Sequence, residues 1–335
     1  MWVEGHAHTH NSTMASTSLV VVGFLAGVLG CVQGQFDYTL RPIIGILSQH
    51  PSDSILEGLE DKNYTSYIAA SYVKHFESAG ARVVPILINQ DDAYYENLAK
   101  HLNGFVFPGG ATSITNSSGY GAAGAKIYQL VKEANLKGVY LPLWGTCLGF
   151  EMITYLAAGE EKWLASCRAS NKVDPLTVTE DYMNSRIFTQ MPDYVIGYLR
   201  LLNTTVNFHK WCMTPENFTL SGLADEFKLL ATSFDYDGLE YVALMEHVAL
   251  PIFGSQFHPE KNQFEWKDDG AHDAIPHTPQ AVGVGQYFAN FFATQARLNS
   301  QKFPSEEEET AALIYNYQPF FTQATSGFVQ AYLFR

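Results

Sequence analysis

One cysteine stands between two glycines at a spacing that suits nucleophilic catalysis. The pentapeptide 145–149, GTCLG, lies inside the apolar segment 139–159, whose pattern predicts a strand, a tight turn and a helix. Small residues on both sides of a nucleophile allow a sharp strand-to-helix turn that aims backbone N–H groups at a substrate. A helix N-terminus also favours the thiolate. The pattern predicts Cys147 as a nucleophile, and a buried structural cysteine is the alternative.

A histidine and a glutamate close a second apolar strand pattern. The run 256–260, QFHPE, places His258 at the strand end, where the following proline fixes it, with Glu260 two residues further on. Such an imidazole suits a base that takes the thiol proton while the carboxylate orients the ring. Taken alone, His258 fits a structural histidine equally well.

A third motif offers hydrogen-bond donors. Residues 108–110, PGG, follow a predicted strand and form a turn whose backbone N–H groups could stabilise an oxyanion. By itself this would be an ordinary loop. The three motifs together indicate nucleophilic catalysis more strongly than any one of them.

Alternating strand and helix patterns position these motifs. They predict an α/β fold with a mostly parallel sheet flanked by helices, whose ligands bind at the carboxyl ends of the strands. Between 172 and 219 the pattern weakens into segments that we interpret as edge strands and loops covering the site. The predicted strands are 42–47, 82–88, 104–107, 140–144, 228–234, 240–246 and 251–257, and the predicted helices are 67–79, 92–102, 120–135 and 279–299.

An apolar run near the start predicts export. Residues 19–29 have the length of a signal-peptide core, so we expect a leader over 1–34 and a catalytic domain over 35–335. No Lys or Arg precedes the run, and Met14 could be the true start. A buried strand is the alternative.

Possible N-glycosylation sites and the number of cysteines also bear on whether the chain is exported. With Cys31 in the leader, the mature chain keeps an odd number of cysteines, and Cys147 is the natural free one. Cys167 and Cys212 either pair or stay buried thiols. Four asparagines could carry N-linked glycans on an exported chain: Asn63, Asn116, Asn203 and Asn217.

Composition excludes several classes of protein. The 335 residues are 47% hydrophobic and 16% charged, enough for one large core. The net charge of −14 and the absence of Lys or Arg clusters argue against nucleic-acid binding. The acidic run 306–309 is interpreted as solvated surface. No feature implies a metal or an organic cofactor.

The motifs carry a family resemblance. The strings 107–110 (FPGG), 145–149 and 258–260 resemble the class I glutamine amidotransferase-like superfamily, which has a flavodoxin-like single-domain fold. The longer strings resemble the gamma-glutamyl hydrolase family, peptidase family C26, from about residue 41 to the C-terminus. These strings are 41–47, 67–73, 143–151, 207–211 and 258–261.

The resemblance implies specific roles. Cysteine attack on a γ-glutamyl amide would form a thioester that water then hydrolyses, with folyl and antifolyl poly-γ-glutamates as substrates. The implied catalytic residues are Cys147, His258 and Glu260. The implied oxyanion donors are Gly110 and Leu148, and the implied substrate contacts are His209 and Tyr67, for which core packing is the alternative.

The resemblance also carries expectations about partners and location. It implies a small-molecule substrate, the lysosome or the extracellular space, and no membrane in the mature form. A homodimer would fit the family, although the chain itself does not indicate one. A glutamine amidotransferase (glutaminase) module and an inactive folate-binding relative are the alternative functions.

Overall fold

An eight-stranded sheet positions the rest of the fold. This computed structural model describes residues 38–57 and 59–335. The strand order is β3-β1-β4-β5-β11-β10-β9-β7, in which the first five strands are parallel and the last three each pair antiparallel with the preceding neighbour. The predicted mostly parallel sheet is confirmed. In sheet order the strands are Arg82–Ile86, Ile43–Leu47, Gly104–Phe107, Leu143–Thr146, Ile252–Ser255, Glu240–His247, Phe227–Phe234 and Thr177–Val178.

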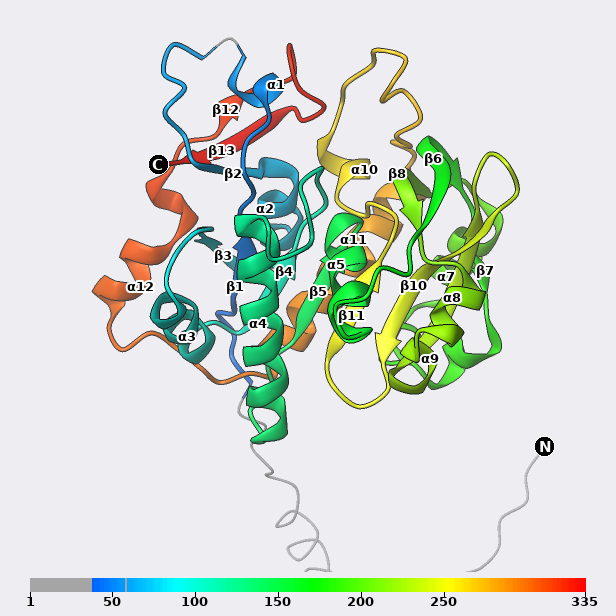
Figure 1. Cartoon of the computed structure of the whole chain (residues 1–335), viewed down its shortest axis with the longest axis horizontal. Helices are drawn as coiled ribbons and strands as arrows, with labels where there is room; N and C mark the ends of the chain where they lie inside the picture. Colours follow the sequence, from blue (N-terminus) through cyan, green and yellow to red (C-terminus); the bar gives the residue numbers. More distant parts are fainter. Residues whose placement is uncertain (1–37, 58) are drawn as a thin grey trace, which may run out of the picture. The chain divides into compact units, whose positions relative to one another are not determined.

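Helices cover both faces of this sheet and build a core on each. Strand β1 shows why, because successive side chains of a strand point to opposite faces. Ile44 and Ile46 join one core, whereas Ile43 and Leu47 join the other. Figure 1 shows α4 and α5 on the near side of the sheet and α11 on the far side. The first core packs under α2 (Ala70–Glu77), α7 (Asp193–Leu201) and α11 (Pro279–Arg297), and the second under α3 (Asp92–His101), α4 (Gly119–Leu136), α5 (Leu148–Ala157) and α8 (Pro215–Leu220).

The predicted helix over 67–79 is wrong at its start. Residues Ser66–Ala69 form strand β2, and α2 begins only at Ala70. Strand β2 pairs antiparallel with β13 (Gln330–Phe334), which also pairs with β12 (Phe320–Phe321). Backbone partners from the far end of the chain therefore override the local helical pattern.

Region 172–219 contains more regular structure than predicted. Strands β6 (Ala165–Asp174) and β8 (Thr205–Cys212) form a separate antiparallel pair. Helix α7 between them is missing from the sequence prediction, although Val195 and Leu199 are buried at helical spacing. Further short elements are α1 (Asp53–Leu56), η1 (Glu180–Asn184), α6 (Arg186–Thr189), α9 (Leu223–Glu226), α10 (Lys261–Phe264) and η2 (Ile314–Asn316).

A disulfide links the β6–β8 pair. Cys167 and Cys212 are bonded, with their Cα atoms 5.9 Å apart. The choice that the sequence left open is thereby decided. Cys147 is the free cysteine among residues 38–57 and 59–335, as expected.

The acidic run is a capped helix and only partly a solvated surface. Helix α12 (Glu306–Ala312) begins after Ser305, whose side chain accepts a hydrogen bond from the Glu308 N–H group. Residues 306–308 are exposed as expected. Glu309 is not, because its carboxylate pairs with Arg82 and, at 3.3 Å, with Arg41. The solvated interpretation is therefore wrong for Glu309.

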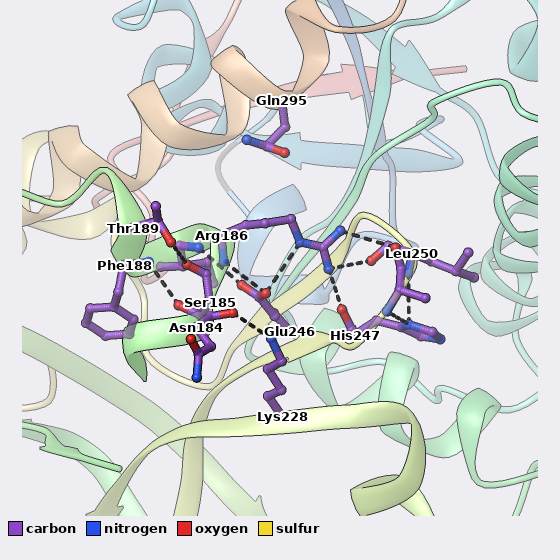
Figure 2. A network of polar contacts seen from close by, with 12 residues as sticks. Asn184, Ser185, Arg186, Phe188, Thr189, Lys228, Glu246, His247, Leu250 and Gln295 are labelled. Atoms are coloured by element: carbon purple, nitrogen blue, oxygen red, sulfur yellow. Dashed lines mark hydrogen bonds and ion pairs between the residues drawn. The ribbon is translucent and has the colours of Figure 1, made fainter. Parts of the chain in front are cut away.

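A buried charge network closes the turn between β10 and β11 (Figure 2). The Glu246 carboxylate accepts the backbone N–H groups of Arg186 at 3.0 Å and of Ile187 at 3.1 Å. The Arg186 guanidinium in turn donates to the carbonyls of His247 and Leu250. Because these carbonyls belong to the turn, the network fixes the entry of the chain into β11.

Some predictions fall on residues that the structure does not describe. The predicted leader, its apolar run 19–29 and Cys31 lie outside the described residues. The described residues from 38 to 335 belong to one compact unit. Within residues 38–57 and 59–335, no helix has the length and apolarity needed to cross a membrane.

Candidate active site

Cys147 occupies a strained turn between β5 and α5. Its backbone has φ of +51° and ψ of −107°, an unfavourable region for any residue with a side chain. The N–H group of Cys147 donates to the Ser255 carbonyl at 2.8 Å and holds the turn against β11. A Cβ atom at Gly145 would lie 2.5 Å from the Gly149 carbonyl oxygen, and one at Gly149 would lie 2.0 Å from the Phe107 carbonyl oxygen. Both glycines are therefore required by the close approach of backbones.

His258 and Glu260 lie just beyond β11, the strand beside β5. The His258 N–H group donates to the Val206 carbonyl at 2.9 Å, which ties the segment to β8. Its Nδ1 atom lies 2.7 Å from Glu260 Oε1, and both side chains are buried. The Nε2 atom has no hydrogen-bond partner in the part of the chain that the structure describes. The ring therefore keeps one nitrogen available for a reacting group.

The glycine loop after β4 brings the cysteine and the histidine together. A Cβ atom built on Gly109 would lie 2.8 Å from His258 Cε1 and 3.1 Å from Cys147 Cβ. The same loop meets Tyr72 of α2, because the Gly109 N–H group donates to the Tyr72 hydroxyl at 2.8 Å. That hydroxyl is 3.4 Å from His258 Nδ1. Only a glycine leaves room for these three side chains.

Burial governs the protonation of the thiol. It raises the pKa of Cys147 well above the ordinary value, and the charges of Glu151 and Glu260 raise it further. The Leu148 N–H group and Lys261 lower this pKa, but by less. The helix end favours the thiolate, as the sequence predicted, but burial outweighs this effect and favours the protonated thiol. The thiol needs a base.

His258 has the protonation state of a base. Burial lowers the pKa of His258, although Glu260 opposes that shift, so the ring is neutral near neutral pH. Burial is the largest single effect on the pKa of Glu260 and raises it, but His258, Lys261 and a backbone hydrogen bond together lower this pKa by more. An ionised Glu260 accepts a hydrogen bond from Nδ1–H, which leaves the lone pair on Nε2.

Two backbone N–H groups border the cysteine. That of Gly110 donates to no backbone acceptor within residues 38–57 and 59–335, and that of Leu148 faces the Cys147 sulfur. Gln49 holds the loop of Gly110, since its Nε2 atom donates to the Gly109 carbonyl at 2.9 Å and the Pro108 carbonyl at 3.3 Å. The loop is therefore prepared to donate to an oxyanion near Cys147.

A cavity of about 400 Å³ opens over these groups. Tyr67 of β2, for which the resemblance implies a substrate contact, lines it, and its ring packs against Phe328 from the C-terminal segment. Segments from distant parts of the chain supply the walls. The lining residues are Gln49, His50, Pro51, Ser52, Tyr67, Gly109, Gly110, Ala111, Thr112, Cys147, Phe208, His258, Lys261, His272, Gly327 and Phe328.

A second cavity of about 300 Å³ adjoins the first at Thr112 and contains Leu148. Glu151 of α5 lines it, and burial raises the pKa of this carboxyl to about 8. Its Oε1 atom accepts a hydrogen bond from Gln256 at 3.2 Å. At neutral pH Glu151 is therefore mostly a neutral acid beside the cysteine turn.

His209 is placed differently from Tyr67. It is 3% exposed on β8 and lines neither of these two cavities. Its Nδ1–H group donates to the Trp211 carbonyl at 3.1 Å, and burial lowers its pKa to about 3. Cys167 and Cys212 lie close to this ring, but their disulfide leaves no thiolate to bind a metal. A substrate contact for His209 stays a prediction.

Three important residues were missed or left unassigned by the sequence analysis. Tyr72 lies within the predicted helix 67–79 without a role of its own, and Gln49 belongs to no motif. Lys261 appeared only as the last letter of the string 258–261. Each acts on a partner distant in sequence, so local patterns held no signal beyond the residue type. From the sequence alone, Tyr72 could have been noticed as a site residue only because it places a hydroxyl on an otherwise apolar helix face.

Comparisons with known proteins agree with this geometry. Residues 42–260 match the family described as Peptidase C26. A gamma-glutamyl hydrolase of Homo sapiens is 40% identical over 324 residues, covering 94% of this chain and 98% of the human protein. That of Mus musculus is 42% identical over 295 residues, covering 88% of this chain and 90% of the mouse protein.

Proposed function

This chain belongs to the peptidase C26 family, and from that premise we propose that Cys147, His258 and Glu260 form the catalytic triad of a cysteine-type gamma-glutamyl hydrolase. The hydrogen bond between His258 and Glu260, beside a free cysteine on a strained turn, supports the assignment. The full-length match to gamma-glutamyl hydrolases supports the bond that is cleaved.

Acylation uses the groups already described. His258 Nε2 takes the proton from the Cys147 thiol, and Sγ attacks the γ-carbonyl carbon of a glutamyl residue. The N–H groups of Gly110 and Leu148 stabilise the oxyanion. The C–N bond then breaks, His258 returns the proton to the leaving amine, and a γ-glutamyl thioester remains on Sγ.

Deacylation repeats these steps with water. His258 Nε2 takes a proton from water, and the hydroxide oxygen attacks the thioester carbonyl. The C–S bond breaks, and the thiolate recovers its proton from His258. Glu260 stays ionised throughout and stabilises the imidazolium that forms in each half-reaction.

We propose folyl and antifolyl poly-γ-glutamates as the substrates. Aromatic side chains line much of the larger cavity, which suits a flat heteroaromatic group next to the glutamate chain. Tyr67, Phe208 and Phe328 are the residues offered for this contact. His209, buried on β8, is proposed as a further substrate contact, as the family resemblance implies.

We also propose export to the lysosome or the extracellular space. The Cys167–Cys212 disulfide and the exposure of Asn63, Asn116 and Asn203 support it. Asn217 is less suited to a glycan, because its Nδ2 atom donates to the Trp163 carbonyl at 2.7 Å. Glycopeptide mass spectrometry tests these sites, and light scattering tests the predicted homodimer.

The position of free Cys147 against the His258–Glu260 pair carries the proposed function. Purified wild type and Cys147→Ala are each incubated with a pteroyl poly-γ-glutamate, and the products are identified by mass spectrometry. We expect loss of glutamate units with wild type alone. An active alanine variant contradicts the assigned nucleophile, and an inactive, folded wild type contradicts the activity.

A further inference from the structure

The larger cavity has an unusual charge for this protein. The chain carries a net charge of −14, yet none of the described residues that line this cavity is Asp or Glu. Lys261 is the lining residue with a permanent positive charge, and three histidines accompany it. Within an acidic protein, a cavity of this composition points to a negatively charged ligand.

Lys261 is held firmly but has no ionic partner. The residue is 4% exposed, and its Nζ atom lies 5.1 Å from the ring centre of Phe208 and 4.8 Å from that of Phe328. Both rings also line the cavity. Cation–π contacts of this kind fix an ammonium group without neutralising it. In the part of the chain that the structure describes, Nζ takes part in no hydrogen bond and no ion pair within 4 Å.

The nearby acidic groups are engaged elsewhere. Glu260 accepts a hydrogen bond from His258 at 2.7 Å, and Glu265 accepts the Val329 N–H group at 2.7 Å. Both feel the charge of Lys261 at longer range. A buried charge without a close partner is costly, so its retention at the cavity wall indicates that a ligand supplies the missing anion.

We propose that Lys261 binds an α-carboxylate of the poly-γ-glutamate chain next to the scissile bond. This rests on the proposed function, since γ-linkage leaves one free α-carboxylate on every glutamate. Lys261 directly follows Glu260, so an anion on Nζ lies close to the triad. A lysine ammonium acts as a point charge and accepts a carboxylate in several orientations. Lys261 thereby selects γ-linked glutamate over neutral amides.

The test separates binding from general electrostatics. Lys261 also lowers the pKa of Cys147, so its loss affects the hydrolysis of every substrate. We therefore compare two substrates, a pteroyl tri-γ-glutamate and the same compound with its α-carboxylates replaced by carboxamides. The measured quantity is the ratio of the two kcat/KM values. An effect on the thiol cancels in this ratio, whereas a contact with the carboxylate does not.

Wild type is compared with Lys261→Met and Lys261→Arg. Methionine keeps the length and the packing between the two rings, and arginine keeps the charge. We expect wild type to prefer the carboxylate substrate by about 10- to 100-fold, the range of a charged hydrogen bond. Lys261→Met should lose the preference and Lys261→Arg should keep most of it. Lys100→Met, an exposed change of equal charge on α3, should match wild type.

Two outcomes overturn the proposal. One is an unchanged preference in a folded Lys261→Met, as judged by circular dichroism. The other is a wild type that hydrolyses both substrates equally well, a result that needs no variant. A wild type that hydrolyses neither substrate contradicts the proposed function instead.

Discussion

The Arg186–Glu246 network and the Cys147 site lie at opposite ends of β11 and treat buried polar atoms in opposite ways. Around Glu246 the carboxylate and the guanidinium are met by backbone groups and by each other. Around Cys147, the atoms His258 Nε2 and Glu260 Oε2 have no hydrogen-bond partner within the described residues. Saturated buried groups stabilise a fold, whereas unsaturated ones cost stability and await a ligand.

The largest expected effect is at the unsaturated site. Cys147→Gly should abolish hydrolysis, and it should also be more stable than Cys147→Ala by about 1 kcal/mol, because glycine relieves the strain at φ of +51°. Urea denaturation measures the difference. As a control, Ala125→Gly in the interior of α4 should be less stable than wild type by about 1 kcal/mol. Equal stability of the two Cys147 variants would show that the turn stores no strain.

A substitution in the saturated Arg186–Glu246 network should mainly lower stability, whereas the substitution at Cys147 mainly removes activity. Glu246→Ala leaves the Arg186 guanidinium without its carboxylate and should lower the free energy of unfolding by about 3 to 5 kcal/mol. The kcat/KM of the protein that remains folded should stay close to wild type. Glu240→Ala on the same strand is the control and should cost less than about 0.5 kcal/mol. If kcat/KM of folded Glu246→Ala also fell by a factor equivalent to about 3 to 5 kcal/mol, the network would control activity as well as stability.

Tyr72 is a case between the two regions, because its hydroxyl is hydrogen-bonded but lies beside the proposed triad. Its hydroxyl accepts the Gly109 N–H group and lies beside His258, so it positions the triad without touching substrate. Tyr72→Phe should lower kcat by about tenfold, equivalent to one buried hydrogen bond, and leave KM nearly unchanged. A change confined to stability, with an unaltered kcat and pH profile, would make Tyr72 a packing residue.

The smallest effect concerns pH. Burial lowers the pKa of His258, so the acid limb of kcat/KM should fall below the ordinary histidine value of 6.5. Glu151 should ionise at about pH 8, and its new charge raises the pKa of the Cys147 thiol, so activity should decline above that pH. In Glu151→Gln the alkaline limb should move upward. Identical alkaline limbs of the pH profile in wild type and Glu151→Gln would show that ionisation of Glu151 does not affect kcat/KM.

The sequence analysis could single out the proposed reacting groups because their signals are local. A strand, a turn and a helix around Cys147, and a strand end before His258, each occupy a few consecutive residues. The groups that control these residues come from elsewhere in the chain. Tyr72 meets Gly109, and Lys261 meets Phe328. No local pattern encodes such contacts.

Contacts between distant residues also limit what the sequence predicts about the fold. The parallel strands were predicted from apolar runs, but β2 was assigned to a helix because its partner β13 lies at the other end of the chain. The protonation of Cys147 was predicted from the helix end alone. Burial, which depends on the complete fold, has the opposite and larger effect.

The C-terminal segment completes the wall of the larger cavity. Gly327 and Phe328 form part of the cavity wall, and β13 holds them by pairing with β2 beside Tyr67. During translation the thiol, the imidazole and the carboxylate are all synthesised well before this wall exists. A chain without β13 therefore carries every proposed reacting group but lacks part of the cavity wall.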